Sequence, residues 1–232
     1  MELTPDQIIL FSIGPWQVNA TIGFTWLVMV VLTVASWLVT RRLRPDVPPK
    51  RWRTMLEVIV KTIEGQIAEI APASARHVLY FSGTLFLFIL VSNVLGVVPG
   101  FHAPTGSLST TAGLALAVLV AVPAFGIASR GVSGYLKTYI QPSWIMLPFN
   151  IIGEASRGLS LAIRLYGNVM SGAVIAAILL GVAPLFFPVL MHMLGLLTGV
   201  IQAYIFAVLA TVYIASATVE PTRTNNLGDP TS

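Results

Sequence analysis

An arginine interrupts a long apolar run in the segment Ser160-Leu161-Ala162-Ile163-Arg164-Leu165-Tyr166-Gly167-Asn168, and the chain stays apolar beyond it from Val169 to Val200. An arginine at the centre of a membrane helix costs about 2.5–3.5 kcal/mol on insertion scales and on the order of 10 kcal/mol in simulations. Such charges mark ion paths, counter-ions or proton relays by default. The alternative is an arginine that extends to the membrane interface or pairs with a nearby acid. We favour the functional interpretation.

The composition around this segment is that of a membrane protein. The 232 residues are 56% hydrophobic and 9% charged, with a mean hydropathy of +0.84. A soluble domain carries about 25% charged residues. We therefore predict an all-α membrane protein with about five membrane helices of about 20 residues each. An amphipathic surface helix and a hairpin of two long, tilted C-terminal helices complete the prediction.

The sequence also excludes several classes of function. The absence of cysteine excludes disulfides, thiolate metal sites and cysteine nucleophiles. The net charge of +4 comes mostly from residues between Arg41 and Arg76, beside a predicted span. That is the pattern of a cytoplasmic loop, so we expect no nucleic-acid partner. The phosphate-binding, zinc-binding and nucleophile-elbow motifs G-x-x-x-x-G-K-[ST], H-E-x-x-H and G-x-S-x-G are absent. We expect no cofactor and no metal.

Changes in polarity divide the chain into six predicted segments. Apolar residues at helical spacing indicate the surface helix between Arg53 and Ala71. A helix from Trp144 to Leu180 would be much longer than the hydrocarbon layer, so it must tilt or kink. The acidic first residues lack the basic region of a signal peptide, so we expect none. The segments are an outer N-terminal segment (1–20), the first transmembrane helix (21–40), a basic cytoplasmic loop with the surface helix (41–76), two transmembrane helices with their loops (77–143), the long hairpin with the ion-path residues (144–217) and a cytoplasmic tail (218–232).

Polar side chains recur on one side of the helix that contains Arg164, because residues three, four and seven apart are neighbours there. Glu154 and Arg157 are three residues apart, so we expect them to pair. Arg164 has no acid within a turn, and its guanidinium does not deprotonate readily. It therefore needs water or a carboxylate from elsewhere, and we infer that a partner subunit brings a carboxylate to it within the lipid bilayer. The predicted stripe consists of Asn150, Glu154, Arg157, Leu161, Arg164, Asn168 and Ser171.

The last helix offers a face that fits this stripe. Gly195 and Gly199 form a small-residue pair that permits close backbone approach. Gln202, one turn later, either meets Arg164 or Asn168 or only joins two helices, and we leave both open. His192 is a weak metal candidate, and a proton-relay role suits it better, because histidine is the side chain that ordinarily changes charge near neutral pH. For Asn93 in the second span, we predict a hydrogen bond to another helix.

Three motifs together resemble subunit a of the membrane sector of F-type ATP synthases. The similarity covers nearly the whole chain in the expected order. The arginine motif and the last-helix motif are highly specific in combination. The motifs are Leu161-Ala162-Ile163-Arg164-Leu165-Tyr166-Gly167-Asn168, Gln202-Ala203-Tyr204-Ile205-Phe206-Ala207-Val208-Leu209 with Val212-Tyr213-Ile214, and Ser92-Asn93-Val94-Leu95-Gly96-Val97-Val98-Pro99-Gly100-Phe101 with Pro104-Thr105.

The resemblance implies a stator beside a rotating ring of c subunits, held by b-type peripheral stalk subunits in a bacterial inner membrane. The N-terminus would lie outside and the C-terminus in the cytoplasm. The subunit would not catalyse ATP chemistry itself. Each ring subunit would present a mid-membrane carboxylate, reached through two offset half-channels with Arg164 between them. Asn168 and Gln202 match polar channel residues of the family.

The chain departs from the usual family pattern at the half-channels. The acid or histidine nine residues after the arginine is replaced by Ala173, and its partner in the last helix by Gly195. The acid fourteen residues before the arginine falls at Asn150, with Glu154 one turn later. The outer half-channel must then use Asn168, Ser171, His192 or water alone. The segments Asn150–Glu154 and Met170–Gly172 resemble the alternate N-type ATPases, for which sodium as well as the proton is a candidate coupling ion.

Two other classes of function remain as alternatives. A stand-alone secondary transporter would use Arg164 as an anion site and would transport without partners, but the internal repeat typical of that class is not visible. A membrane enzyme would use Glu154 and Arg157, but the sequence offers no convincing nucleophile or metal set. We rank the transporter second and the enzyme third.

Overall fold

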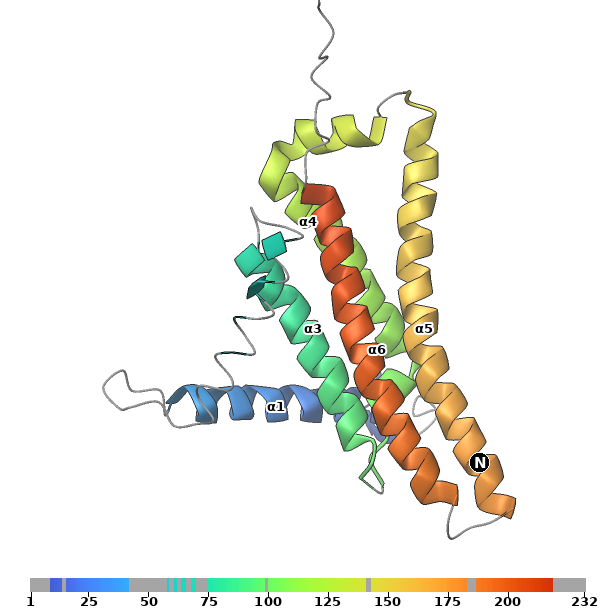
Figure 1. Ribbon diagram of the computed structural model, residues 1–232. Helices are drawn as coiled ribbons and strands as arrows, with labels where there is room; N and C mark the ends of the chain where they lie inside the picture. Colours follow the sequence, from blue (N-terminus) through green and yellow to red (C-terminus); the bar gives the residue numbers. More distant parts are fainter. Residues whose placement is uncertain are drawn as a thin grey trace, which may run out of the picture.

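The structure is a computed structural model that describes residues 9–13, 16–41, 58, 61, 64–65, 68–69, 75–98, 100–140, 143–182 and 187–218. Five long helices dominate it (Figure 1). The elements are β1 (Ile9–Ile13), β2 (Trp16–Asn19), α1 (Ala20–Arg41), α3 (Ala75–Leu95), the 3-10 turn η2 (Pro104–Gly106), α4 (Leu108–Ile140), α5 (Met146–Val182) and α6 (Phe187–Thr218).

Each of the five helices is long and apolar enough to cross a membrane. This confirms the predicted all-α membrane fold and makes the chain a multi-pass membrane protein. The two long C-terminal helices are also confirmed, as α5 and α6. The predicted surface helix and the tail beyond Thr218 fall almost entirely outside the described residues.

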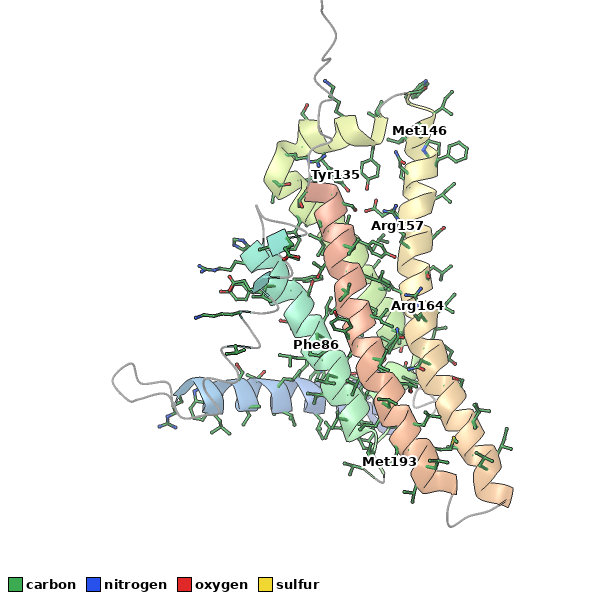
Figure 2. The ribbon with its side chains drawn as sticks, in the orientation of Figure 1. Phe86, Tyr135, Met146, Arg157, Arg164 and Met193 are labelled. Carbon is green, nitrogen blue, oxygen red and sulfur yellow. The ribbon has the colours of Figure 1, made fainter. Side chains whose placement is uncertain are left out.

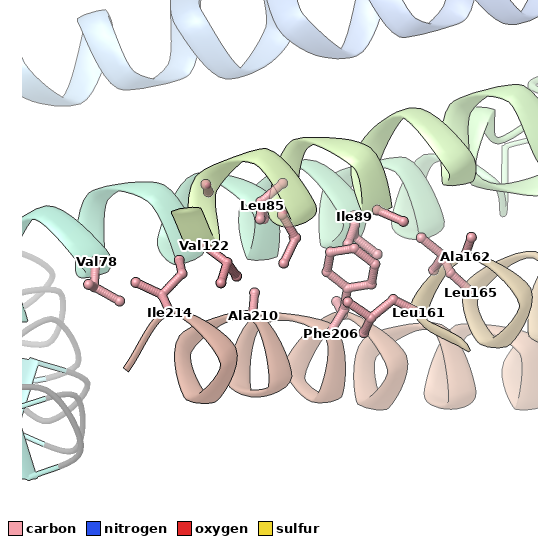
Figure 3. Close-up of a cluster of buried hydrophobic side chains, with 14 residues drawn as sticks. Val78, Leu85, Ile89, Val122, Leu161, Ala162, Leu165, Phe206, Ala210 and Ile214 are labelled. Atoms are coloured by element: carbon pink, nitrogen blue, oxygen red, sulfur yellow. The ribbon is translucent and has the colours of Figure 1, made fainter. Parts of the chain in front are cut away.

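Four of the helices share one core. α6 packs against α3, α4 and α5, and α4 packs against α5. The hydrophobic cluster between them is aliphatic apart from one aromatic ring, and small alanines on α6 let the helices approach (Figure 3). The largest of these side chains, all at most 1% exposed, are Phe206, Ile89, Leu161, Leu165, Ile214, Val78 and Val118.

α1 lies apart from this bundle. Figure 1 shows it crossing α3 at a steep angle, near the end where α3 finishes. The five helices therefore cannot all run along the membrane normal. α1 has 22 residues and α5 has 37, or about 33 Å and about 55 Å at 1.5 Å per residue. Against a hydrocarbon layer of about 30 Å, α1 fits a direct crossing and α5 requires a strong tilt.

A polar clamp joins α3, η2 and α6. The Asn93 amide nitrogen donates to the Gly199 carbonyl oxygen at 3.0 Å, and the Thr105 hydroxyl donates to the Asn93 amide oxygen at 2.7 Å. This confirms the interhelical hydrogen bond predicted for Asn93. Gly199 must be small, because a Cβ there would lie 3.0 Å from the Asn93 Cβ.

Two features differ from the sequence prediction. The N-terminal segment contains an antiparallel hairpin, β1 paired with β2, that no sequence pattern indicated. The third span does not end near Ser129. α4 continues to Ile140 through Gly131, whose φ of 73° and ψ of 165° turn the chain. This conformation is essentially confined to glycine. We call the part of α4 after this turn, Val132–Ile140, the α4 leg.

Candidate functional site

The predicted polar stripe runs along the edge of α5 that borders α6. Leu161 and Leu165 on α5 are buried against the bundle, whereas Arg157 and Arg164 are exposed. Figure 2 shows both arginines along the same side of α5. No hydrogen bond or ion pair of Arg164 occurs within the described residues. The structure thus agrees with the inference that Arg164 lacks an acid of its own in this chain.

A first cavity of about 240 Å³ opens at the end of the bundle where α5 and α6 meet. It brings together two of the predicted residues, Asn168 and His192, and adds Asn93 and His102. Ala173 and Gly195, where the acid and histidine of the family pattern are missing, also line it. Ser171 lies outside it, and its hydroxyl donates to the Asn168 backbone oxygen at 3.2 Å.

A second cavity, also of about 240 Å³, lies at the opposite end of the α5–α6 pair. It gathers the other three residues of the predicted site that precede Arg164, namely Asn150, Glu154 and Arg157. Tyr135 and Tyr139 of the α4 leg line it too. A small neighbouring space of about 10 Å³ extends from Glu154 and Arg157 to Leu161 and Tyr213.

An apolar seal separates the two cavities. No residue lines both of them. Leu161 lines the small space beside the second cavity, and Asn168 lines the first. These two residues are seven positions apart on α5, or about 10 Å. The seal consists of Leu161, Leu165 and Phe206, which are at most 1% exposed. Arg164 lies on α5 at the level of this seal.

The expected pair of Glu154 with Arg157 is wrong. The Tyr139 hydroxyl donates to Glu154 Oε2 instead, and the Arg157 guanidinium lies 5.6 Å from the centre of the Tyr213 ring. The cause is tertiary: the turn at Gly131 brings the α4 leg across the end of the bundle, where its tyrosines reach α5. A partner from another helix therefore replaces the neighbour three residues along α5.

The two tyrosines of the α4 leg are the site residues that sequence reasoning missed. Tyr135 donates to the Tyr139 hydroxyl at 2.8 Å, and Asn150 Nδ2 donates to the Tyr139 backbone oxygen at 3.1 Å. Their spacing of four residues puts them on one helix face. This spacing is the feature of the sequence from which the pair could have been predicted. Burial raises the pKa of Tyr139, and its hydrogen bond to Glu154 raises it further. Tyr139 therefore keeps its proton and acts as a donor.

Gln202 is buried, and its Nε2 has no hydrogen-bond partner among the described residues. Neither contact considered for it, with Arg164 or with Asn168, is made through this nitrogen. An unpaired buried amide costs about 1–3 kcal/mol. Because α5 and α6 are antiparallel and Arg157 is level with Tyr213, Gln202 lies near the level of Asn168, at the inner limit of the first cavity.

No group of three His, Cys, Asp or Glu side chains that could hold a metal ion occurs in the described part of the chain. What the site offers is electrostatic: the permanent positive charge of Arg164 lies at the level of the seal, and the cavity on either side contains polar side chains. A helical membrane protein with such a charge between two cavities belongs to the class of proteins that move ions across membranes.

Comparison with known proteins specifies the family within this class. The family model described as "ATP synthase A chain" matches residues 22–215. ATP synthase subunit a 2 of Acaryochloris marina is 60% identical over 217 residues, which cover 94% of this chain and 93% of that protein. Subunit a 1 of Chlorobaculum parvum is 55% identical (94% and 96% covered), and subunit a of Albidiferax ferrireducens is 55% identical (94% and 94%). The chain belongs to the ATP synthase A chain family, whose members form the ion-channel part of the stator in the membrane sector of ATP synthase.

Proposed function

We propose that the first and second cavities are the two half-channels of the stator and that Arg164 separates them. The main support is their arrangement: two cavities of about equal volume lie on either side of Arg164 along α5 and share no lining residue. An ion that enters one cavity meets the apolar seal before it reaches the other. It must therefore leave the chain and cross on a partner, which is the ring of c subunits.

Arg164 would control the carboxylate of the ring. Its charge is permanent, so it favours the ionised form of an acid that approaches it and displaces the bound ion. Two unit charges 4 Å apart attract by about 4 kcal/mol at an effective dielectric constant of 20. The same positive charge repels cations that would otherwise pass straight from one cavity to the other. A guanidinium also offers a planar set of donors that matches a carboxylate.

We assign roles to the other polar residues from the cavity that each of them lines or borders. Asn168, His192 and the Gln202 amide would hydrate or relay the ion at the first cavity, with Ser171 beside it. Asn150, Glu154 and Arg157 would do so at the second. The basic residues Arg130 and Lys137 lie on α4 near the second cavity, which by the positive-inside rule puts that cavity on the cytoplasmic side. The N-terminus would then lie outside, and the membrane would be the bacterial inner membrane.

Ring and stalk contacts follow from the same arrangement. The exposed edge of α5 with Arg164 would face the c subunits, and b-type stalk subunits would hold the stator in place. We further propose membership of the alternate N-type branch, because Ala173 and Gly195 put no ionisable group into the first cavity. The ionisable groups that line this cavity, His102 and His192, come from other positions, and sodium as well as the proton is a candidate coupling ion. ATP-driven transport that persists with sodium in the presence of a protonophore would identify sodium as the coupling ion.

Substitution of Arg164 tests the proposal. In membranes that carry the whole ATP synthase, we expect Arg164→Ala to abolish ATP-driven ion pumping while the complex still assembles. Arg164→Lys should be severely impaired, because a compact ammonium lacks the reach and shape of the guanidinium. Normal pumping by either variant would refute the proposal. Transport by the isolated chain in liposomes would favour a secondary transporter instead.

A further inference from the structure

The second cavity contains the one acid of the membrane part of the chain. Glu154 is the single aspartate or glutamate between Arg76 and Thr218. The titratable and charged groups nearest to it come from three helices: Tyr135 and Tyr139 on α4, Arg157 on α5 and Tyr213 on α6. Arg130, also on α4, lines neither space, and its Nε donates to the Thr218 carbonyl oxygen at 3.4 Å.

Tyr139 is fixed from three directions. Its hydroxyl donates to Glu154 and accepts from Tyr135, and its backbone oxygen accepts from Asn150. Gly126 makes room for this arrangement, because a Cβ there would lie 2.5 Å from the Tyr135 ring. Glu154 therefore accepts its hydrogen bond from a neutral group, the Tyr139 hydroxyl. A neutral hydroxyl orients a carboxylate but leaves its negative charge uncompensated, whereas an arginine would compensate it.

Arg157 is held in a different direction. Its guanidinium lies over the Tyr213 ring of α6, a contact that attracts a cation to the face of the ring. On an isolated helix, an acid and an arginine three residues apart would attract each other. Here one tyrosine from α4 holds the acid and one from α6 holds the base. The two opposite charges of the second cavity are thus kept apart.

We propose that Tyr139 is a positioning residue for ion translocation: it holds Glu154 away from Arg157, so that the Glu154 carboxylate binds the coupling cation in the second cavity. This inference rests on the ion path proposed above. Carboxylate and hydroxyl oxygens are hard ligands that suit sodium or a hydrated proton. The cavity has room for water around such an ion, since one water molecule occupies about 30 Å³ in the liquid.

Removal of the Tyr139 hydroxyl should weaken the binding of this ion. Without its donor, Glu154 turns to Arg157, and an opposite charge at close range favours the ion-free carboxylate. A higher concentration of the coupling ion is then needed on the cytoplasmic side. A change of one pKa unit corresponds to a tenfold change in proton concentration, so we expect a shift of about three- to tenfold.

Inverted membrane vesicles that carry the whole ATP synthase give the test, because their bath contacts the cytoplasmic side. ATP-driven pumping is measured over a range of bath pH and of sodium concentration. We expect Tyr139→Phe to raise the half-saturating concentration of the coupling ion, with the maximal rate retained. Glu154→Gln should shift it in the same direction, and the double variant should match Glu154→Gln alone. Tyr80→Phe, the same change at an exposed tyrosine of α3, is the matched control.

The outcomes separate this inference from the proposed function. Normal pumping by Arg164→Ala refutes the ion path itself. An inactive Arg164→Ala together with a Tyr139→Phe that behaves like Tyr80→Phe refutes only the role of Tyr139. A lower maximal rate at an unchanged half-saturating concentration would also overturn it, because that is the result of a purely structural role. If Glu154→Gln does not pump at any concentration of the coupling ion, the half-saturating concentration of Tyr139→Phe alone decides whether the inference holds.

Discussion

At the scale of single residues, the two exposed arginines of α5 differ in their surroundings. Arg157 lies over the Tyr213 ring, whereas Arg164 has no such contact in the described part of the chain. A buried or membrane-embedded guanidinium needs water or an acid, because it does not deprotonate. The acid near Arg157, Glu154, accepts a hydrogen bond from Tyr139, and the described residues offer no acid to Arg164. The requirement for an external carboxylate is therefore stronger than the sequence alone indicated.

Phe206 is the residue whose loss should affect the seal most. It is the largest fully buried side chain and lies between the two cavities. We expect Phe206→Ala to lower the free energy of unfolding by about 3–5 kcal/mol and to open a passive leak of ions through the membrane sector. The leak is measured in vesicles without ATP. Ile201→Ala, at a half-exposed site on the same helix, should leave the membrane tight, and an equal leak from both variants would contradict the assignment of the seal.

At the scale of helices, the hydrogen-bonded contact of Asn93 on α3 with α6 depends on one glycine. A Cβ at Gly199 would meet three atoms of the Asn93 side chain at 3.0–3.2 Å. We expect Gly199→Ala to break the hydrogen bond to Asn93 and to destabilise the chain by about 1–3 kcal/mol. The thermal unfolding of the detergent-solubilised chain measures this. Gly113→Ala on α4, where a Cβ meets nothing within 4 Å, is the control and should be neutral or stabilising.

The α4 leg depends on Gly131 in the same way. An alanine there would have to adopt a backbone conformation that costs about 1–3 kcal/mol. We expect Gly131→Ala to displace the leg, so that Tyr139 leaves Glu154. Pumping by this variant should then need more of the coupling ion, as in Tyr139→Phe, and its melting temperature should fall. A variant that melts earlier but keeps the normal ion dependence would show that the leg does not position Glu154.

The sequence predicted the long helices well, because apolar runs of 20 residues or more leave few alternatives in a membrane. It also predicted that Asn93 bonds to another helix, since a lone amide in a span tends to bond to a neighbouring helix. It did not predict the partner of Glu154. Arg157 was the nearest candidate along the chain, but Tyr139, fifteen residues away, became the partner through a turn that depends on the backbone of Gly131. The β1–β2 hairpin was missed because its strands are only five and four residues long.

At the scale of the whole molecule, the fold places one cavity at each end of the α5–α6 pair. Each cavity draws on a different set of helices and loops, while α3, α4, α5 and α6 enclose the core between the two cavities. This arrangement explains why so long a hairpin is needed. Two water-accessible spaces and a dry segment must fit along one pair of helices, and a helix of about 20 residues would be too short for all three.

Sided thiol labelling tests this central claim most directly, because the chain contains no cysteine of its own. Single alanine-to-cysteine changes are made at Ala173 in the first cavity, at Ala217 in the second and at Ala162 in the buried core. A membrane-impermeant reagent is then applied to the assembled complex from either side. We predict that Ala173→Cys reacts only from the outer side, Ala217→Cys only from the cytoplasmic side, and Ala162→Cys from neither. Reaction of Ala173→Cys and Ala217→Cys from the same side, or of Ala162→Cys from any side, would contradict the two-cavity path.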